Sequence, residues 1–249
     1  MKELEKKFDK IKKARQTKPV DILMNKKFLR ENKKENIKYW LHEINVLHND
    51  EYKNHFPEKD PYGLGEFERI AVVGNSGSLL DSGLGEEIDN HDKVIRFNTA
   101  PIGNYANDVG SRTDFRVSIG SLSYRSENET LLRSYRRNVQ AVKDKDNVLE
   151  KSWHLIFTHR FCHWVQSFKE DENNNSHVCS TGFQGVFFAL LLSEEVNLYG
   201  FQLPTGDSDF EYHYYNNNEY VERSHKFKQE HALYNYLDAN ADWFTWKEV

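Results

Sequence analysis

The sequence predicts an α/β fold with a mainly parallel central sheet and helices on both faces. From residue 68 onward, short apolar runs of strand length alternate with segments of helical periodicity, and glycine or small polar residues separate them. Such alternation is typical of βαβ units in a parallel sheet. The expected strands are 70–73, 93–98, 115–119, 155–158 and 196–199, and the expected helices are 76–82, 130–144 and 181–194.

The first strand leads into the most informative turn of the chain. Residues 69–80 read RIAVVGNSGSLL, so an apolar run ends at Gly74, passes small polar residues and resumes with helical spacing. We expect a buried strand that turns tightly into a helix, with unpaired N–H groups at the turn. These groups and the helix dipole would favour an anion, phosphate above all, and Gly74 and Gly77 would let the backbone approach it.

A cleft is expected at the carboxyl ends of the strands, where ligands of parallel sheets bind. Asn75, Asn98 and residues 180–182 fall at predicted strand ends or helix starts, so one cleft could collect them. Taken alone, Asn75 could simply stabilise a turn, and Ser180 is an ordinary N-cap for the apolar helix that follows. A nicotinamide dinucleotide site is rejected, because residues 74–77, GNSG, lack the G-x-G-x-x-G spacing.

Length and charge limit the domains and partners. With 249 residues, the chain can form one large domain or a domain with an appendage. Residues 1–60 are lysine-rich with helical apolar spacing, and we expect them to form a helical N-terminal extension to a domain of residues 61–249. The formal net charge of -5 does not indicate nucleic acid as a partner. No stretch approaches the ~20 apolar residues that cross a bilayer.

Four segments follow one another in the order of a known set of motifs. They are 70–114 (from IAVVGNSGS to NDVGSRTD), 180–201 (STGFQGVFFALLLSEEVNLYGF), 213–215 (HYY), and His225 with Glu230 in the pattern H-x4-E. They resemble the large, small, third and very small sialyl motifs of the eukaryotic-type sialyltransferases, glycosyltransferase family 29. Within that family, residues 98–110 most resemble the α2,8-sialyltransferase branch.

The resemblance implies a Rossmann-like fold, the GT-A-like variant of sialyltransferases, and an inverting transfer. The implied partners are CMP-sialic acid, or the CMP donor of a related nonulosonate, and a glycan acceptor that ends in galactose or sialic acid. The leaving group, cytidine monophosphate, carries one phosphate, so no cofactor and no metal are expected. Residues 207–209, DSD, resemble the metal-binding D-x-D of other transferases, but two acids in a polar loop are usually solvated. The alternative function is a catalytically silent CMP- or glycan-binding protein.

The resemblance also assigns roles to individual residues. His225 is the expected general base, because a neutral imidazole is available near physiological pH, and Glu230 is expected to give structural support. His213, the second expected catalytic residue, would contact the departing phosphate. Asn216 stands where the family usually has an acidic residue, and the tyrosines beside His213 could instead pack a loop. The expected donor- and nucleotide-binding residues are Asn75, Ser76, Gly77, Asn98, Ser180, Thr181, Gly182 and Tyr214.

Two cysteines that form a disulfide in Golgi-resident relatives are missing together, with Ile70 and Ser193 in their places. Cys162 and Cys179 are the only cysteines, and residues 1–7 lack the apolar core of a secretory signal. We therefore expect a cytoplasmic protein, or one in the Golgi lumen if the N-terminus has been trimmed.

The protein is expected to fold and act fully in the presence of a reductant, because the family disulfide is not there to be broken. The measurements are thermal unfolding and CMP release, with and without dithiothreitol. A loss of activity or of unfolding cooperativity in dithiothreitol would contradict this expectation.

Overall fold

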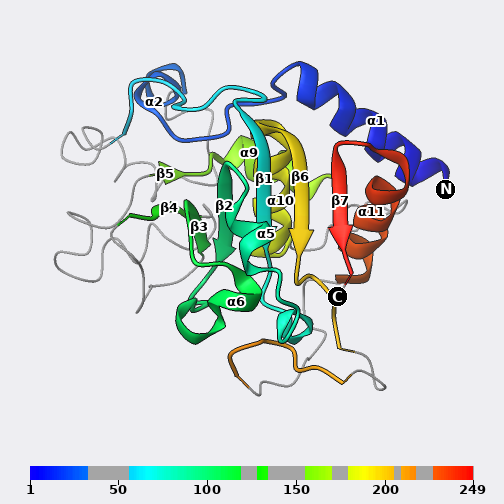
Figure 1. Ribbon diagram of the computed structural model, residues 1–249. Coiled ribbons are helices and arrows are strands. Elements are labelled where there is room, and N and C mark those ends of the chain that lie inside the picture. The colour runs from blue at the N-terminus through cyan, green and yellow to red at the C-terminus, as the bar shows by residue number, and fades with distance from the viewer. Residues whose placement is uncertain are drawn as a thin grey trace.

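The computed structural model describes residues 1–32, 56–118, 128–133, 155–169, 179–204, 209–216 and 227–248. Within them, one seven-stranded sheet has the strand order β5-β4-β3-β2-β1-β6-β7 (Figure 1). All its pairings are parallel, which confirms the predicted sheet, and all five expected strands are present with shifted ends. The strands are β1 (Phe67–Val73), β2 (Lys93–Phe97), β3 (Phe115–Ser118), β4 (Thr130–Arg133), β5 (Leu155–Ile156), β6 (Ser193–Tyr199) and β7 (Phe244–Lys247).

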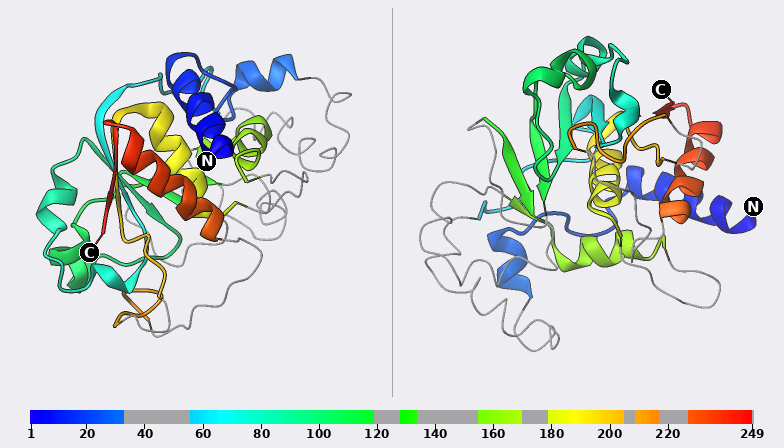
Figure 2. Two further views of the ribbon diagram at one scale, coloured as in Figure 1. Left: turned by 90° about the vertical axis from the view of Figure 1, so that its right-hand side faces the viewer. Right: turned by 90° about the horizontal axis from the view of Figure 1, so that it is seen from below.

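Helices cover both faces of this sheet, as predicted. One face carries α10 with α9, α11 and α1, whereas α5 and α6 lie on the opposite face (Figure 1, Figure 2). The α-helices are α1 (Lys2–Gln16), α2 (Lys26–Glu31), α5 (Gly85–Asp89), α6 (Ala106–Val109), α9 (His159–Gln166), α10 (Thr181–Leu192) and α11 (Phe227–Asn240), and the 3-10 helices are η2 (Gly77–Leu79) and η3 (Gly103–Tyr105).

The alternation of side chains along the strands divides the apolar core into two layers. In β1, Ile70 and Val72 belong to the cluster that contains the side chains of α10, whereas Ala71 and Val73 belong to the cluster that contains side chains of α5 and α6. Successive side chains of a strand point to opposite faces, so a strand covered on both faces needs apolar residues at every position. The continuous apolar run 70–73 meets this requirement.

The central helix of the larger layer is α10. Its sequence, TGFQGVFFALLL, is apolar on all sides, and residues 183–192 are buried. Such a helix must be enclosed by other elements, and α10 contacts the sheet, α9 and α1. Gly185 allows the close approach to β2, because a Cβ at this position would lie 2.4 Å from the ring of Phe97.

The first helix, α1, packs against this helical layer. Ile11 is buried in the same cluster as α10. Arg15 donates hydrogen bonds to the main-chain oxygens of Leu190 (2.7 Å) and Glu194 (2.6 Å), where α10 ends. The cationic side chain thus satisfies one of the carbonyl groups that a helix leaves unpaired at its C-terminus, that of Leu190, and also the carbonyl of Glu194 at the start of β6. The domain boundary after residue 60 stays a prediction.

Three of the expected helices differ from those in the structure. The helix predicted over 130–144 is wrong for 130–133, which form β4 and pair with β3, and residues 134–144 lie outside the described residues. Leu131 and Leu132 are both buried in this pairing, so tertiary packing overrides the local helical pattern. The expected helix 76–82 is reduced to η2, and the expected helix 181–194 ends at Leu192. The sequence patterns did not indicate α5, α6, α9 or β7.

Shortening the side chain of Ile11 should destabilise the whole protein, because α1 shares its core with α10. Ile11→Ala is expected to lower the free energy of unfolding by about 2–4 kcal/mol, as large-to-small changes in cores do. The exposed Lys13→Ala on the same helix is the control and should stay within about 0.5 kcal/mol. Urea unfolding measures both, and equal effects would mean that α1 is not an integral part of the fold.

Candidate active site

A cavity of about 210 Å³ opens at the carboxyl ends of β1, β2 and β6. The chain leaves β1 toward β2 on one side, and β6 lies on the other, so this is the point where the strand order reverses. Parallel sheets bind ligands at such points, because two adjacent connections diverge there and leave a crevice. The lining residues are Gly74, Asn75, Ser76, Phe97, Asn98, Ser180, Thr181, Gly182, Gly200, Phe201, Gln202, Leu203, Tyr212, His213, Phe227, Glu230 and His231.

The expected gathering of Asn75, Asn98 and residues 180–182 is therefore confirmed. These residues are distant in sequence, but each follows a strand or begins a helix at the same edge of the sheet. The chain segments that resemble the large, small and third motifs all reach the cavity, together with Glu230 of the segment that resembles the very small motif. His225 lies outside the described residues, and α11 begins two positions after it, at Phe227.

The expectation of free N–H groups after β1 is wrong for three residues of this turn. The N–H of Gly74 donates to Tyr199 (2.7 Å), that of Ser76 to Gly200 (3.1 Å) and that of Gly77 to Glu211 (3.0 Å), in each case to the main-chain oxygen. These acceptors come from distant parts of the chain, so a local pattern cannot reveal them.

The two glycines of this turn allow close packing between chain segments. A Cβ on Gly74 would lie 2.1 Å from the carbonyl oxygen of Gly200, and one on Gly77 would lie 2.4 Å from that of Glu211. Gly77 is absent from the lining of the cavity, whereas Gly74 forms part of it. The absence of side chains here therefore serves contacts of main chain with main chain, not only the approach of a ligand.

Asn75 reaches the cavity with part of its hydrogen-bonding capacity unused. Its main-chain oxygen accepts from the N–H of Tyr214 (2.9 Å), and its Nδ2 donates to the hydroxyl of Tyr215 (3.4 Å). Its Oδ1 is buried and has no hydrogen-bond partner among the described residues. Buried polar atoms are nearly always paired in native proteins, so this oxygen is available to a donor group that a ligand would bring.

Asn98 adopts a backbone conformation that few residue types accept. Its φ is +50°, in the left-handed region where asparagine is among the better-tolerated residues. Its N–H donates to the oxygen of Val117 (3.0 Å), and its own oxygen accepts from Nη1 of Arg116 (3.0 Å). The main chain of Asn98 is thus fully paired at the point where β2 ends at the cavity.

The N-terminus of α10 forms the helical wall of the cavity. Ser180 is the N-cap, since its Oγ accepts from the N–H of Phe183 (2.9 Å), as expected from its sequence position. Its Oγ also donates to Oε2 of Glu230 (2.6 Å), and its N–H donates to Oε1 of Glu230 (2.9 Å). Thr181 and Gly182 line the cavity in the first turn, where N–H groups have no partner within the helix.

Glu230 is the most deeply buried acid of the site. Beside its bonds to Ser180, its Oε1 accepts from Nζ of Lys169 (2.7 Å), and both side chains of this ion pair are almost completely buried. Burial raises the pKa of Glu230, and the bonds from Lys169 and Ser180 act in the opposite direction. The carboxyl group thereby joins the segment that follows α9, the start of α10 and the first turn of α11.

His213 makes stacking contacts with two aromatic rings. The ring of Tyr212 is stacked on it at 4.4 Å between centroids, and the ring of Tyr215 at 5.0 Å. Its Nδ1 is 3.2 Å from Oδ1 of Asn216, an atom that only accepts, so Nδ1 carries the proton and Nε2 is an acceptor in the neutral ring. Burial lowers the pKa of His213, which favours this neutral form.

Tyr214 does not line the cavity. Its hydroxyl donates to the main-chain oxygen of Pro101 (2.6 Å), and its buried ring packs edge-on against Tyr105. Burial raises the pKa of Tyr214, so the phenol stays protonated and keeps this bond. The structure therefore shows Tyr214 in a packing role, and its contact with the nucleotide stays a prediction.

Three residues that line the cavity were not among the site residues expected from the sequence. His231 follows Glu230 directly on α11, and burial lowers its pKa to about 4, so its imidazole is neutral. Gln202 and Leu203 follow β6, and the rule that ligands bind beyond carboxyl ends of strands could have indicated them.

Among the described residues, no helix is both long and apolar enough to span a membrane. The same part of the chain holds no group of three or more His, Cys, Asp or Glu side chains placed to bind a metal ion. Of the D-x-D candidate, residues 207 and 208 lie outside the described residues.

Sequence comparison links the chain to one family. A profile of glycosyltransferase family 29 (sialyltransferase) matches residues 13–154 and 119–241. The chain is similar to alpha-2,8-sialyltransferase 8E of Rattus norvegicus, with 32% identity over 212 residues, 73% of this chain and 56% of that protein. It is also similar to CMP-N-acetylneuraminate-beta-galactosamide-alpha-2,3-sialyltransferase 1 of Gallus gallus, with 31% identity over 188 residues, 64% of this chain and 51% of that protein. Sialyltransferase-like protein 2 of Arabidopsis thaliana is 29% identical over 160 residues, 60% of this chain and 33% of that protein.

Solved structures share the fold. A crystal structure of a mammalian sialyltransferase matches with a TM-score of 0.60 and 24% identity, over 73% of this chain and 69% of that one. A crystal structure of a mammalian sialyltransferase in complex with Gal-beta-1-3GalNAc-ortho-nitrophenol matches with a TM-score of 0.66 and 21% identity, over 92% and 90% of the two chains. The chain spans between 33% and 56% of the length of the curated relatives named above. Because the profile match extends over most of the chain and its motif segments meet at one cavity, the chain belongs to glycosyltransferase family 29, the sialyltransferases.

Proposed function

We propose that this protein transfers sialic acid, or a related nonulosonate, from its CMP donor to a hydroxyl group of a glycan acceptor. The observation that carries the proposal is the cavity at the carboxyl ends of β1, β2 and β6, where three motif segments and Glu230 of the fourth converge. Family membership supports the reaction class. The acceptor would end in galactose or sialic acid, and relatives of both α2,3 and α2,8 type match at similar identity, so both linkages are retained.

The donor would be held by groups that carry no net charge. Asn75 and Asn98 would bond the nucleotide and its phosphate, and the first-turn N–H groups at Thr181 and Gly182 would bond the phosphate or the sialic acid carboxylate. Uncharged hydrogen-bond donors are suited to a reaction that must release a charged product, because they bind an anion without holding it too tightly for release. No metal ion is required in this scheme, because a single phosphate leaves with less charge than a diphosphate.

His225 would act as the general base. The acceptor hydroxyl oxygen attacks the anomeric carbon from the side opposite the phosphate, and the proton of the hydroxyl passes to the imidazole of His225. The bond between the anomeric carbon and the phosphate oxygen breaks, and its electron pair leaves with CMP. One displacement of this kind inverts the anomeric centre. The contacts of Glu230 with Ser180 and Lys169 support a structural role for this acid in holding α11.

His213 would contact the departing phosphate only in its protonated form. The neutral ring offers Nε2 as an acceptor, and two acceptors do not bond. A bound phosphate would stabilise the cation and raise the pKa of His213 above the value that burial imposes. An acidic residue at position 216, as the family usually has, would stabilise the His213 cation whether or not a phosphate is bound. With Asn216 in this place, the stabilisation would have to come from the bound phosphate.

The alternative of a silent binding protein is not favoured, because both His213 and His225 are retained. The cytoplasmic location stays a prediction from the sequence.

Replacing His225 with alanine should remove turnover and leave donor binding. We expect His225→Ala to lower the rate of CMP release by about 10²–10⁴-fold, the usual contribution of a general base, with the Kd for CMP little changed. His163→Ala, an exposed histidine of α9, is the matched control. The assay uses sialylated and galactosylated acceptors, with and without a chelator. Near-normal turnover of His225→Ala would refute the base, and full loss of activity in chelator would refute the metal-free mechanism.

Asn216→Asp should shift the pH at which CMP binding weakens to a higher value. A carboxylate beside Nδ1 stabilises the imidazolium, so the pKa of His213 rises by about one unit or more. CMP binding is favoured below this pKa and weakens as pH rises through it, so the midpoint of weakening should shift to higher pH. Calorimetric titration between pH 5 and 8 measures the midpoint, and Asn240→Asp at the exposed end of α11 is the control. An unchanged midpoint would mean that His213 does not contact the phosphate.

A further inference from the structure

Two buried arginines hold opposite ends of the connection between β2 and β3. Arg96 of β2 and Arg116 of β3 are paired in register on adjacent strands, and both are at most 1% exposed. Each guanidinium donates to main-chain oxygens of this connection, residues 98–114. The connection begins at Asn98, beside the cavity, so the two arginines differ in their distance from the candidate donor site.

Arg116 combines an ion pair with two main-chain contacts. Its Nε and Nη2 donate to the two carboxylate oxygens of Glu129, the second at 2.8 Å, in a bidentate fork. The remaining nitrogen, Nη1, donates to the main-chain oxygens of Asn98 (3.0 Å) and Ala100 (3.1 Å). All three guanidinium nitrogens are therefore engaged, which a lysine with its single ammonium could not reproduce.

The contacts of Arg116 hold the main chain of Asn98 in an unfavourable conformation. Asn98 has a φ of +50°, which is unfavourable for a residue other than glycine and persists only when its surroundings impose it. Nη1 of Arg116 imposes it by drawing the carbonyl groups of Asn98 and Ala100 toward one point. The Asn98 side chain is thereby directed from a fixed backbone at the edge of the cavity.

We propose that the buried pair Arg116–Glu129 is a positioning device that presets Asn98 for the CMP moiety of the donor. This inference rests on the proposed function, since it requires Asn98 to contact the nucleotide. Glu129 orients the guanidinium, and Arg116 fixes the main chain of Asn98 before the ligand arrives. Affinity is gained because the ordering of Asn98 is not left to the binding step.

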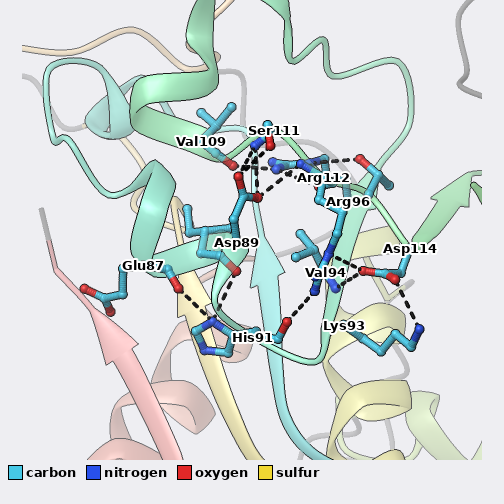
Figure 3. A network of polar contacts seen from close by, with 12 residues as sticks. Glu87, Asp89, His91, Lys93, Val94, Arg96, Val109, Ser111, Arg112 and Asp114 are labelled. Atoms are coloured by element: carbon cyan, nitrogen blue, oxygen red, sulfur yellow. Dashed lines mark hydrogen bonds and ion pairs between the residues drawn. The ribbon is translucent and has the colours of Figure 1, made fainter.

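Arg96 provides a matched control. It donates to the oxygens of Val109 and Arg112 and to Oγ1 of Thr113, at the far end of the connection. In the same network, Asp89 accepts from the N–H and hydroxyl of Ser111 (Figure 3). Arg96 is as buried as Arg116 and also bonds main-chain oxygens, but it makes no hydrogen bond to Asn98.

The experiment is a double-mutant cycle read by CMP affinity. The variants are Arg116→Lys, Asn98→Gly, the two combined, and Arg96→Lys. Glycine at 98 removes the amide and keeps the left-handed backbone accessible. Calorimetry gives the Kd for CMP, and thermal unfolding gives the stability of each variant. We expect Arg116→Lys to weaken CMP binding about tenfold in the native background and less than about twofold in the Asn98→Gly background. Arg96→Lys should lower stability but keep the Kd within about twofold.

Three results would overturn the inference. Equal effects of Arg116→Lys and Arg96→Lys on the Kd would show that lost stability alone weakens binding. Effects of Arg116→Lys and Asn98→Gly that multiply would show that Arg116 does not act through Asn98. Failure of the unaltered protein to bind CMP would refute the proposed function, and the inference with it.

If Arg116→Lys does not fold, Glu129→Gln replaces it in the cycle. We then expect a smaller loss of affinity for CMP and the same dependence on Asn98.

Discussion

One buried carboxylate holds the helical side of the cavity together. Glu230 lies in the first turn of α11 and bonds both Lys169, beyond the end of α9, and Ser180, the N-cap of α10. An ion pair in such a place adds little net stability, but loss of one partner leaves an uncompensated buried charge that costs about 3–5 kcal/mol. The segment after α9, the start of α10 and the start of α11 are therefore held in one arrangement. This arrangement also fixes the positions of Thr181, Gly182 and His231, which line the cavity.

The sheet side of the cavity is held by a different device. There, the segment after β1 and residues 211–214 are joined by main-chain bonds, from Tyr214 to Asn75 and from Gly77 to Glu211. The Tyr214 hydroxyl then reaches Pro101 in the connection after β2. The two sides thus combine ionic anchoring of helices with main-chain pairing of loops. Glu230, Ser180 and Asn75 also line the cavity, so residues that hold its two sides together form part of its wall.

The sequence predicted the parts of this structure that follow from local pattern and from sheet geometry. The parallel sheet and the meeting of Asn75 with Asn98 follow from strand ends at one edge. The motif resemblance placed Glu230 at the site. The occupied N–H groups of Gly74, Ser76 and Gly77 could not be predicted, because their acceptors come from residues 199–211. The segment 130–133 has a helical pattern but becomes a strand, since pairing with β3 outweighs local preference. In α11, the mixed sequence FKQEHALYNYLDAN gave no clear period, so His231 went unnoticed.

The contact between Gly74 and Gly200 has a consequence for redesign. A Cβ on Gly74 would overlap the Gly200 carbonyl, and a Cβ on Gly200, whose φ is +65°, would overlap Leu79. Where β1 and β6 end, the cavity is lined in part by these two glycines, which have no side chain to exchange. A redesign of the cavity would therefore have to change other lining positions, such as Gln202, Leu203 and His231, because neither glycine accepts a Cβ without a clash.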